Sequence, residues 1–355
     1  MNLDDFKAFP QIDSQNMLAE IDQLPEQLQT AWDLGMKQLL PDWQGIQQVA
    51  IAGMGGSAIG GDLLCAFILP SCSIPVIVHR NYDLPAWANG TRTLVIACSH
   101  SGNTEETISA FQKAQQNGCR MLVVTTGGKL VRLAQEHAAT VWTFSHAGQP
   151  RAAVGYSFGL LLAFFARMKW IPDPAGELQQ AVADMADQQA YLRADVPIVS
   201  NPAKRLAGQL MGRWVSIFGS DILEPVTRRL KCQINELAKT WAQFEALPEA
   251  DHNTMAGVTH PVEGLYHTMA LFLRARSCHS RNQLRTNLTK QMVMLEGVNT
   301  DFINATGETR LSQLWTALHF GDYLAYYLAM AYDIDPTPIP SIEGFKEELS
   351  RSAQA

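Results

Sequence analysis

The chain has 355 residues with a formal net charge of −7, and hydrophobic residues make up 47% of it. This length and apolar content predict two folded domains, and the acidic balance argues against broad binding of nucleic acids. The first residues lack the basic and apolar regions of a signal peptide, and no run of about 18 apolar residues occurs, so we expect a cytoplasmic protein.

The first half of the chain alternates strand-like and helical segments. Residues 1–45 are polar and amphipathic, which indicates helices. The apolar segments that follow are predicted to be strands, at 48–52, 75–79, 93–98, 120–125 and 140–144. Helical patterns come after the first, third and fourth of these segments. Strands that alternate with helices indicate a parallel sheet that is covered on both faces.

The second half repeats this alternation after two connecting helices, which are expected at 156–168 and at about 176–194. We predict strands at 214–220, near 269–275 and near 301–305, and helices at 310–332 and about 341–351. The predicted fold class is therefore α/β, with two doubly wound parallel sheets. We expect domains at 1–155 and 201–335, a helical linker at 156–200 and a C-terminal helix at 336–355 that closes the site.

Three hydroxyl side chains stand at the turn after the third predicted strand. Ser99, Ser101 and Thr104 surround Gly102 and lead into a helix. A helix N-terminus offers unpaired backbone N–H groups and a positive dipole end, and hydroxyls add further donors. A single Ser of this kind would most often be a helix cap. Three hydroxyls around a glycine favour a site for a phosphate monoester instead.

A glycine-rich turn, residues 53–62, follows the first predicted strand. Considered alone, it is similar to a dinucleotide fingerprint, but Ala58 occupies the third glycine position and no acidic residue ends the second strand. The basic residue after that strand could bind the ribose 2′-phosphate of NADP, so this turn considered alone does not exclude NADP binding. The second phosphate turn argues against NADP, because a dinucleotide site does not need one there. We expect this turn to contribute to the phosphate site through Gly55, Gly56 and Ser57.

Longer stretches carry a resemblance to a known family. They follow one another across nearly the whole chain: GMGGSAIGGD (53–62), NYDLP (81–85), SHSGNTEET (99–107), TTGGKL (125–130), GQPRAAVGYSFG (148–159), INELAK (234–239), DHN (251–253) and EGFKEEL (343–349). The chain resembles the sugar isomerase (SIS) domain proteins and, more narrowly, the bifunctional phosphoglucose/phosphomannose isomerases. The resemblance implies two SIS-type domains.

Glu236 is the candidate catalytic base. A partly desolvated carboxylate can move one proton between C1 and C2 of a sugar phosphate through a cis-enediolate. We expect the apolar neighbours to supply the desolvation, namely Ile234, Leu237, Ala238 and Trp241. Spacing alone favours a surface Glu that pairs with Lys239 or Thr240, but the resemblance implies that this Glu is the enediol base. The sequence departs from the usual family run, Glu-Asn-Ala-Lys, because Leu237 replaces the Asn.

Three more candidate residues lie in matched motifs. Arg151 is the candidate electrophile, because a guanidinium stabilises the charge that develops on enediolate oxygens. Without the motif, this Arg would be read as a surface residue that closes a Pro turn. The resemblance implies that His252 reaches the active site from the partner subunit, that it opens the closed sugar ring, and that Lys346 closes over the sugar.

The remaining polar clusters are expected to be structural. Other histidines, including His146, carry no motif, and the six cysteines have no metal-ligand spacing, so we expect reduced thiols. The basic cluster of Arg228, Arg229 and Lys231 is expected to be a solvated helix face rather than part of the phosphate site.

These features predict an isomerase that interconverts glucose 6-phosphate and mannose 6-phosphate with fructose 6-phosphate. We expect a homodimer that needs neither a metal ion nor a nicotinamide cofactor. Two alternatives stay open: a non-catalytic sugar-phosphate sensor with the same cradle, and an SIS isomerase or aldolase-type enzyme for another phosphosugar. The joint presence of Glu236, Arg151, His252 and Lys346 favours the enzyme, because a sensor needs the cradle only.

Overall fold

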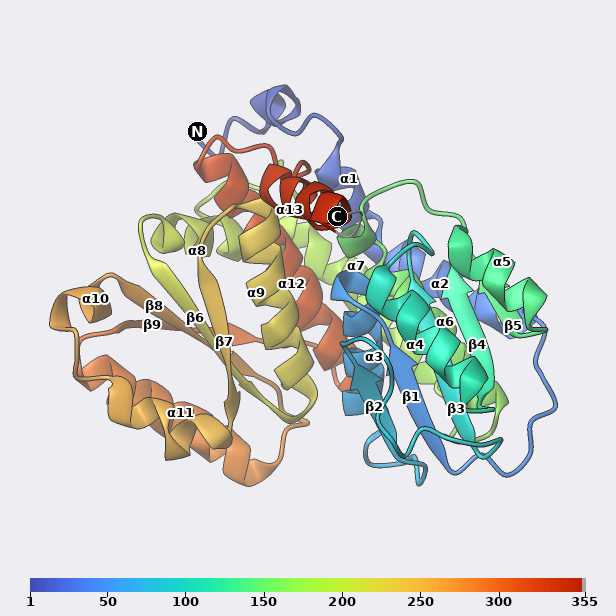
Figure 1. Ribbon diagram of the computed structural model, residues 1–355. Coiled ribbons are helices and arrows are strands. Elements are labelled where there is room, and N and C mark those ends of the chain that lie inside the picture. The colour runs from blue at the N-terminus through green and yellow to red at the C-terminus, as the bar shows by residue number, and fades with distance from the viewer. Residues whose placement is uncertain (353–355) are drawn as a thin grey trace.

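The computed structural model describes residues 1–352 and contains two parallel sheets that lie side by side, with helices between and around them (Figure 1). The first sheet has the strand order β2-β1-β3-β4-β5. Its strands are β1 (Gln48–Ala52), β2 (Val76–His79), β3 (Thr93–Ser99), β4 (Arg120–Thr125) and β5 (Thr140–Thr143). The predicted strands of the first half are therefore confirmed, and every neighbouring pair runs parallel.

The second sheet has the strand order β7-β6-β8-β9 and is also parallel throughout. Its strands are β6 (Trp214–Ser220), β7 (Ala242–Leu247), β8 (Thr268–Arg274) and β9 (Asn299–Asn304). The strands predicted at 214–220, near 269–275 and near 301–305 are confirmed, but β7 was not predicted. The strand lies at the edge of the sheet and its middle residues are half-buried or exposed, so its sequence lacks the apolar run of a central strand.

Helices cover both sheets. The first half contains α1 (Met17–Asp22), α2 (Leu24–Lys37), α3 (Gly55–Ile68), α4 (Glu105–Gln116), α5 (Lys129–Glu136) and α6 (Val154–Arg167). The second half contains α7 (Ala175–Leu192), α8 (Pro202–Leu210), α9 (Glu224–Leu237), α10 (Val262–Tyr266), α11 (Ser280–Leu295), α12 (Arg310–Ala331) and α13 (Pro340–Ser352). The sequence analysis predicted neither α8 nor α11.

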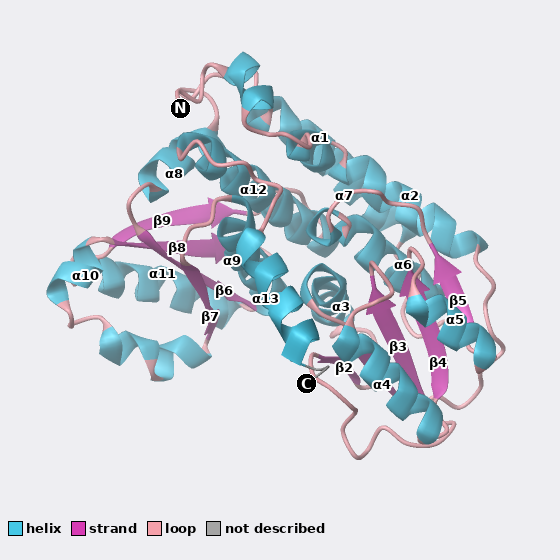
Figure 2. Cartoon of the chain, turned by 45° about the horizontal axis from the view of Figure 1, so that its top comes forward, coloured by secondary structure: helices cyan, strands magenta, loops and turns pink. Residues whose placement is uncertain are grey.

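A row of helices connects the two domains. Helix α12 is buried along nearly its whole length and packs against α7, α8 and α9, and α7 in turn contacts α2 (Figure 2). A helix that is apolar on every side needs partners all round, and this row supplies them. No helix in the described part of the chain is both long and apolar enough to cross a membrane.

Helices α3 and α9 pack against each other in opposite directions. Arg151 lies against Gly56, near the start of α3, and reaches Glu236, near the end of α9. Asp62, further along α3, pairs with Arg228, which is nearer the start of α9. Each helix runs back from the carboxyl edge of its own sheet, so the carboxyl edges of the two sheets face opposite ends of the molecule (Figure 1).

The two domains repeat one strand–loop–helix unit with the same spacing. Strand β3 leads to α4 through residues 100–104, and β8 leads to α11 through residues 275–279. Both strands have seven residues. Each lies beside the first strand of its own domain, β3 beside β1 and β8 beside β6. By this spacing, Ser99 and Ser101 correspond to Arg274 and Arg276. The second domain therefore keeps the backbone frame of the first and changes the side chains on it.

Candidate active site

The three hydroxyls of the Ser99 turn gather at the start of α4, for which Thr104 is the N-cap residue. The Oγ of Ser99 lies 2.8 Å from Oγ1 of Thr104 and accepts a hydrogen bond from the backbone N–H of Gly102. The Oγ of Ser101 accepts one from the N–H of Asn103. One hydroxyl of the Ser99–Thr104 pair donates to the other. The second hydroxyl of that pair and the hydroxyl of Ser101 keep their protons and can donate to an anion.

The glycine-rich turn after β1 meets the Ser99 turn directly. The backbone N–H of His100 donates to Oγ of Ser57 at 3.1 Å. Helix α3 begins at Gly55, and neither Gly55 nor Gly56 donates its backbone N–H to another described residue. The two turns that the sequence analysis paired therefore form one cradle of hydroxyl and backbone donors at the carboxyl edge of the first sheet.

Two glycines of the cradle fit where no other residue would. Gly102 has a φ of +64°, and a Cβ there would collide with the carbonyl oxygen of Gly127. A Cβ on Gly56 would lie 2.5 Å from the carbonyl oxygen of Pro150. The second contact presses the start of α3 against the loop that carries Arg151.

Arg151 is buried, with only 5% of its surface exposed, so its interpretation as a surface residue is excluded. Its Nη2 donates to the carbonyl oxygens of Pro336 at 2.9 Å and Thr337 at 2.5 Å. Its Nη1 lies 3.7 Å from Oε2 of Glu236. Burial lowers the pKa of the guanidinium, and the Glu236 carboxylate opposes that shift. The candidate electrophile and the candidate base thus face each other beside the cradle.

Glu236 sits near the end of α9, where Lys239 holds the backbone. The Nζ of Lys239 donates to the carbonyl oxygens of Glu236, Leu237 and Asp335 at 2.8, 3.2 and 2.9 Å. Burial and the nearby Arg151 charge lower the pKa of Lys239 to about 8. Lys239 therefore contacts the main chain and not the Glu236 carboxylate, the pairing that spacing alone had favoured.

The desolvation expected from Trp241 was wrong. This side chain is 66% exposed and stacks edge-on against Trp214. The Glu236 side chain is 27% exposed and is shielded on one side by the buried Arg151.

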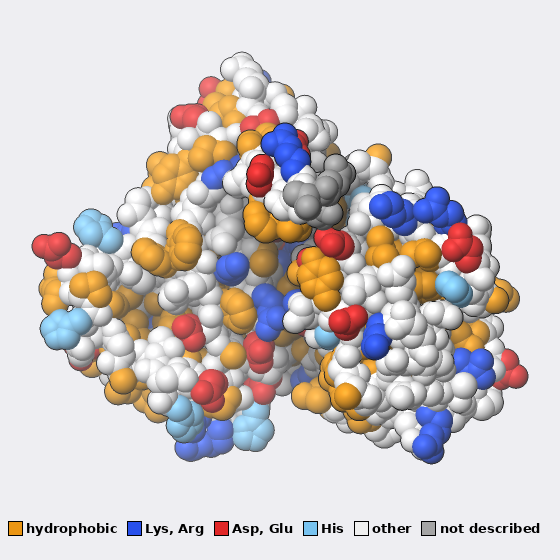
Figure 3. Space-filling view, viewed as in Figure 1, with side chains coloured by type: hydrophobic (Ala, Val, Ile, Leu, Met, Phe, Trp, Pro, Cys, Tyr) orange, Lys and Arg blue, Asp and Glu red, His pale blue; other side chains and the backbone are white. Residues whose placement is uncertain are grey.

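One predicted site residue, His252, lies apart from this group. His252 is exposed and follows β7 at the carboxyl edge of the second sheet, whereas Glu236 lies at the other end of α9. A helix of that length spans about 20 Å, so one chain does not bring the two side chains together. Lys346 lies on α13, which crosses between the domains beside α9 (Figure 2). Basic side chains gather along the hollow over α9 (Figure 3).

The basic cluster on α9 is not a solvated face throughout. Arg229 is 3% exposed and donates two hydrogen bonds to Asp322, at 3.1 and 2.6 Å. Arg228 is partly exposed and pairs with Asp62 at 3.7 Å. The expectation therefore fails for Arg229, which fastens α9 to α12.

A hydrogen-bonded chain beside the cradle escaped the sequence analysis. The Nε2 of His100 lies 3.0 Å from Nδ1 of His146, and Nε2 of His146 lies 3.1 Å from Oε2 of Glu20. Gly148 packs so closely on this chain that a Cβ would lie 2.6 Å from Oε1 of Glu20. The chain connects the phosphate loop to the loop that carries Arg151. Its members are far apart in sequence and share no motif, so no local signal could have found them.

All six cysteines are free, as the sequence analysis predicted. Within residues 1–352, no group of three or more His, Cys, Asp and Glu side chains has the arrangement of a metal site.

Comparisons with known proteins agree with the geometry. Residues 199–349 match the model of the bacterial phospho-glucose isomerase C-terminal SIS domain. A bifunctional phosphoglucose/phosphomannose isomerase of Caldicellulosiruptor bescii is 38% identical over 94% of this chain and 99% of its own length. A relative of the same description in Aquifex aeolicus is 29% identical over 92% of this chain and 96% of its own. A solved structure, a hypothetical protein of Thermus thermophilus, has a TM-score of 0.72 at 15% identity and covers 96% of this chain and 91% of that one.

The chain belongs to the bifunctional phosphoglucose/phosphomannose isomerase family. The resemblance and the predicted fold class, two SIS-type parallel-sheet domains, are both confirmed. Leu237, which replaces the usual family Asn, is fully buried in the core. The replacement therefore leaves the contact between Glu236 and Arg151 in place.

Proposed function

We propose that this protein interconverts glucose 6-phosphate and mannose 6-phosphate with fructose 6-phosphate. The observation that carries the proposal is the pair formed by Glu236 and Arg151, 3.7 Å apart, beside a cradle of hydroxyl and backbone donors. A carboxylate base next to a fixed positive charge is what an enediolate needs. The named activities of the relatives from Caldicellulosiruptor and Aquifex support the choice of substrates.

In the proposed reaction, Ser57, Ser99, Ser101 and Thr104 hold the phosphate together with the backbone of Gly55 and Gly56. Glu236 takes the proton from C2 of the open-chain aldose and returns it to C1, while a hydroxyl proton passes from O2 to O1. Arg151 stabilises the negative charge on the enediolate oxygens in between. Glucose and mannose differ only at C2, which is planar in the enediolate, so one intermediate serves both sugars.

A homodimer supplies the ring-opening histidine in this proposal. Asp251, next to His252, accepts hydrogen bonds from Arg285 and Thr289 of α11, which fixes the His252 loop on that helix. The same helix exposes an apolar stripe at helical spacing: Leu284 44%, Leu288 48%, Met292 55% and Leu295 73%. An exposed apolar stripe marks an interface. We infer that a second copy covers it and receives His252 in its own active site.

The C-terminal helix completes the site in the proposal, and Lys346 acts there on the closed sugar ring. Both domains hydrogen-bond to the backbone of the segment that leads into α13. Arg151 donates to the carbonyl oxygens of Pro336 and Thr337. Lys239 donates to the carbonyl oxygen of Asp335. We therefore propose that the segment 336–355, of which residues 353–355 lie outside the described part of the chain, closes over the sugar. The other proposed units are the domains 1–155 and 201–335 and the linker 156–200. The free cysteines support a cytoplasmic location.

Exchange of protons with solvent tests the function. Fructose 6-phosphate incubated with the protein in deuterated water should acquire deuterium at C1, and aldose products should carry it at C2. The variant Glu236→Gln should bind the sugar and exchange nothing. Binding of fructose 6-phosphate by the unmodified protein without any exchange would make it a sensor rather than an isomerase.

A further inference from the structure

The second domain has its own crevice at the place that corresponds to the phosphate cradle of the first. The loop 275–279 after β8 has the same length and position as the loop 100–104 after β3. Ligands of open α/β sheets bind at this position, outside the carboxyl ends of the strands where the strand order reverses. In the second domain, however, Arg274 and Arg276 stand where the first has Ser99 and Ser101.

A cavity of about 460 Å³ opens there. It is lined by the ends of β6, β8 and β9 and by the first turns of α11, and its lining includes Arg274, Arg276, Asn287, Asn304, Thr306 and Gly307. Among the described residues, those that line the cavity include two arginines and no carboxylate. In a chain of net charge −7, this is a local excess of positive charge.

Arg274 is held in place by neutral groups. Its Nε donates to Oδ1 of Asn304 at 2.8 Å, its Nη1 donates to Oδ1 of Asn287 at 3.3 Å, and its guanidinium lies 3.5 Å from the centre of the Phe302 ring. A guanidinium has donors only, so both asparagines turn their oxygens toward it. Their Nδ2 groups make no hydrogen bond to another described residue. The crevice therefore offers amide donors around a fixed positive charge that no carboxylate of the described chain neutralises.

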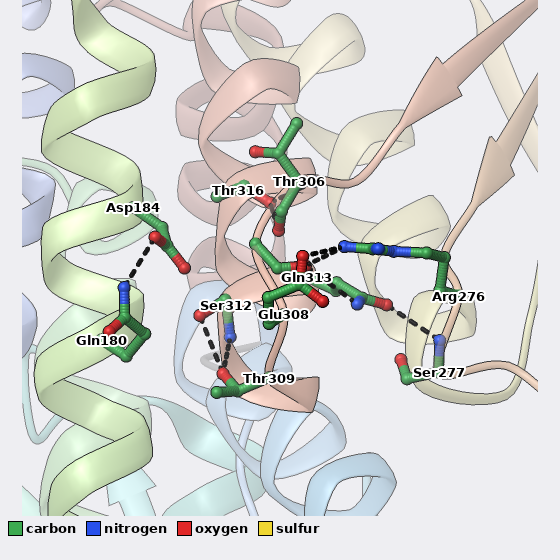
Figure 4. Close-up of polar contacts among 11 residues, drawn as sticks. Gln180, Asp184, Arg276, Ser277, Thr306, Glu308, Thr309, Ser312, Gln313 and Thr316 are labelled. Atoms are coloured by element: carbon green, nitrogen blue, oxygen red, sulfur yellow. Dashed lines mark hydrogen bonds and ion pairs between the residues drawn. The ribbon is translucent and has the colours of Figure 1, made fainter.

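The loops that frame the cavity are tied to each other (Figure 4). Oε1 of the buried Gln313 accepts the backbone N–H of Ser277 at 2.9 Å, and its Nε2 donates to the carbonyl oxygen of Gly307 at 3.0 Å. Arg276 reaches Glu308 at 2.7 Å, but both side chains are mostly exposed, at 67% and 82%, so water screens the pair. An anion in the cavity can compete for Arg276 without displacing a buried partner.

We propose that this crevice is a second binding site, separate from the catalytic cradle, for the phosphate group of a small phosphorylated metabolite. The ligand class follows from the donors: two guanidinium groups, one of them fixed by stacking, and two amide groups surround a space large enough for a small metabolite. Arginine forks recognise tetrahedral and planar oxyanions through paired N–H bonds.

Titration with inorganic phosphate, followed by calorimetry on the full-length protein, tests the proposal. The unmodified chain should bind two phosphates. The variant Arg274→Gln/Arg276→Gln should bind one, and Ser101→Ala/Thr104→Ala should also bind one, at the other site. Arg281→Gln, which removes an exposed arginine of α11 outside the cavity, should still bind two. A stoichiometry unchanged by the double arginine variant would overturn the proposal.

A conservative variant separates binding from folding. Arg274→Lys keeps the charge and removes the fork, so it should weaken phosphate binding at this site by about tenfold, while a single cooperative thermal transition shows that the variant is folded. Unweakened binding in this variant would also count against the proposal. If Ser101→Ala/Thr104→Ala leaves the stoichiometry at two, the catalytic cradle is misassigned, while the arginine variants still decide the second site. Stronger binding of succinate than of phosphate in the crevice would overturn its assignment to phosphate.

Discussion

The carboxyl edges of the two sheets share one backbone frame and carry opposite chemistry. In the first sheet, the loop after β3 presents small hydroxyl residues and a left-handed glycine, so an anion can approach the backbone itself. In the second, the loop of equal length presents Arg274 and Arg276, and its rim is joined by the side chain of Gln313. The fold therefore positions a crevice in both domains, while a few side chains decide what each crevice binds.

The second domain contributes to the candidate active site from its other end. Glu236 reaches the cradle because α9 runs back from the second sheet and ends beside the start of α3. The carboxyl edge of the second sheet, with His252, is left facing away, toward a partner subunit in our proposal. The two domains are therefore not equivalent. The first contributes the carboxyl edge of its sheet to the candidate site, and the second contributes the C-terminal end of α9, which lies away from the carboxyl edge of its own sheet.

Replacing the candidate base, Glu236 near the C-terminal end of α9, should have the largest effect. Glu236→Gln keeps the size and hydrogen-bonding capacity of the side chain but removes its basicity, so kcat should fall roughly 10²–10⁴-fold. Steady-state kinetics with fructose 6-phosphate measures this. Glu224→Gln, at the other end of the same helix, is the matched control and should leave kcat unchanged. Equal losses in the two variants would assign the effect to α9 as a helix rather than to the base.

Removing hydroxyls from the cradle at the carboxyl edge of the first sheet should have the next largest effect. Ser101→Ala/Thr104→Ala deletes two donors to a phosphate dianion, each worth about 1.5–3 kcal/mol, so KM should rise by about 100-fold or more. Ser277→Ala/Thr306→Ala removes two hydroxyls from the second edge and should leave KM unaltered. If the two double variants raise KM alike, the phosphate is not held where the first-domain hydroxyls gather.

A smaller effect is expected from the chain of Glu20, His146 and His100. His146→Ala breaks both of its hydrogen bonds, which loosens the phosphate loop and the Arg151 loop together. We expect KM to rise about fivefold, the size of one neutral hydrogen bond, and kcat to fall by less. His279→Ala is the control, because His279 caps α11 at the position where Thr104 caps α4. No difference between these variants would leave the chain with a structural role only.

The smallest effect is on the pH dependence of unfolding. Burial, reinforced by His146, lowers the pKa of His100 to about 4. The unfolded chain therefore takes up this proton first, at its usual pKa near 6.5, so the stability that neutral His100 contributes is present above pH 6.5 and is lost as the pH falls toward 4. Because the group is partly exposed, we expect a loss of less than about 1 kcal/mol. Denaturant unfolding of His100→Gln should show a flatter curve in this window, and His279→Gln an unchanged one.

The sequence predicted those parts of the fold that rest on local signals. Apolar runs located the buried strands, and the hydroxyls around Gly102 located the cradle, because helix starts and phosphate sites have short-range chemistry. Strand β7 was missed because an edge strand is not apolar throughout. Helix α11 was not predicted, although its exposed apolar residues Leu284, Leu288 and Met292 recur at helical spacing.

Contacts between distant segments were beyond the sequence analysis. Nothing local indicated that Arg151 would be buried against the chain near Pro336, or that Lys239 would hold the backbone of the base-bearing helix. The separation of Glu236 from His252 depends on the direction in which α9 runs. The sequence analysis did not predict β7, which lies between the two residues, so it gave no sign that they end up at opposite ends of α9.

In our proposal, the active site is assembled from two chains, and subunit complementation tests this assembly. Glu236→Gln and His252→Ala proteins are each expected to turn over closed-ring glucose 6-phosphate poorly. When equal amounts are mixed and subunits exchange, each heterodimer should rebuild one complete site, because one chain supplies Glu236 and its partner supplies His252. About a quarter of the unmodified activity should return if dimers form at random. No recovery, with subunit exchange confirmed independently, would contradict the claim and place His252 outside the partner's active site.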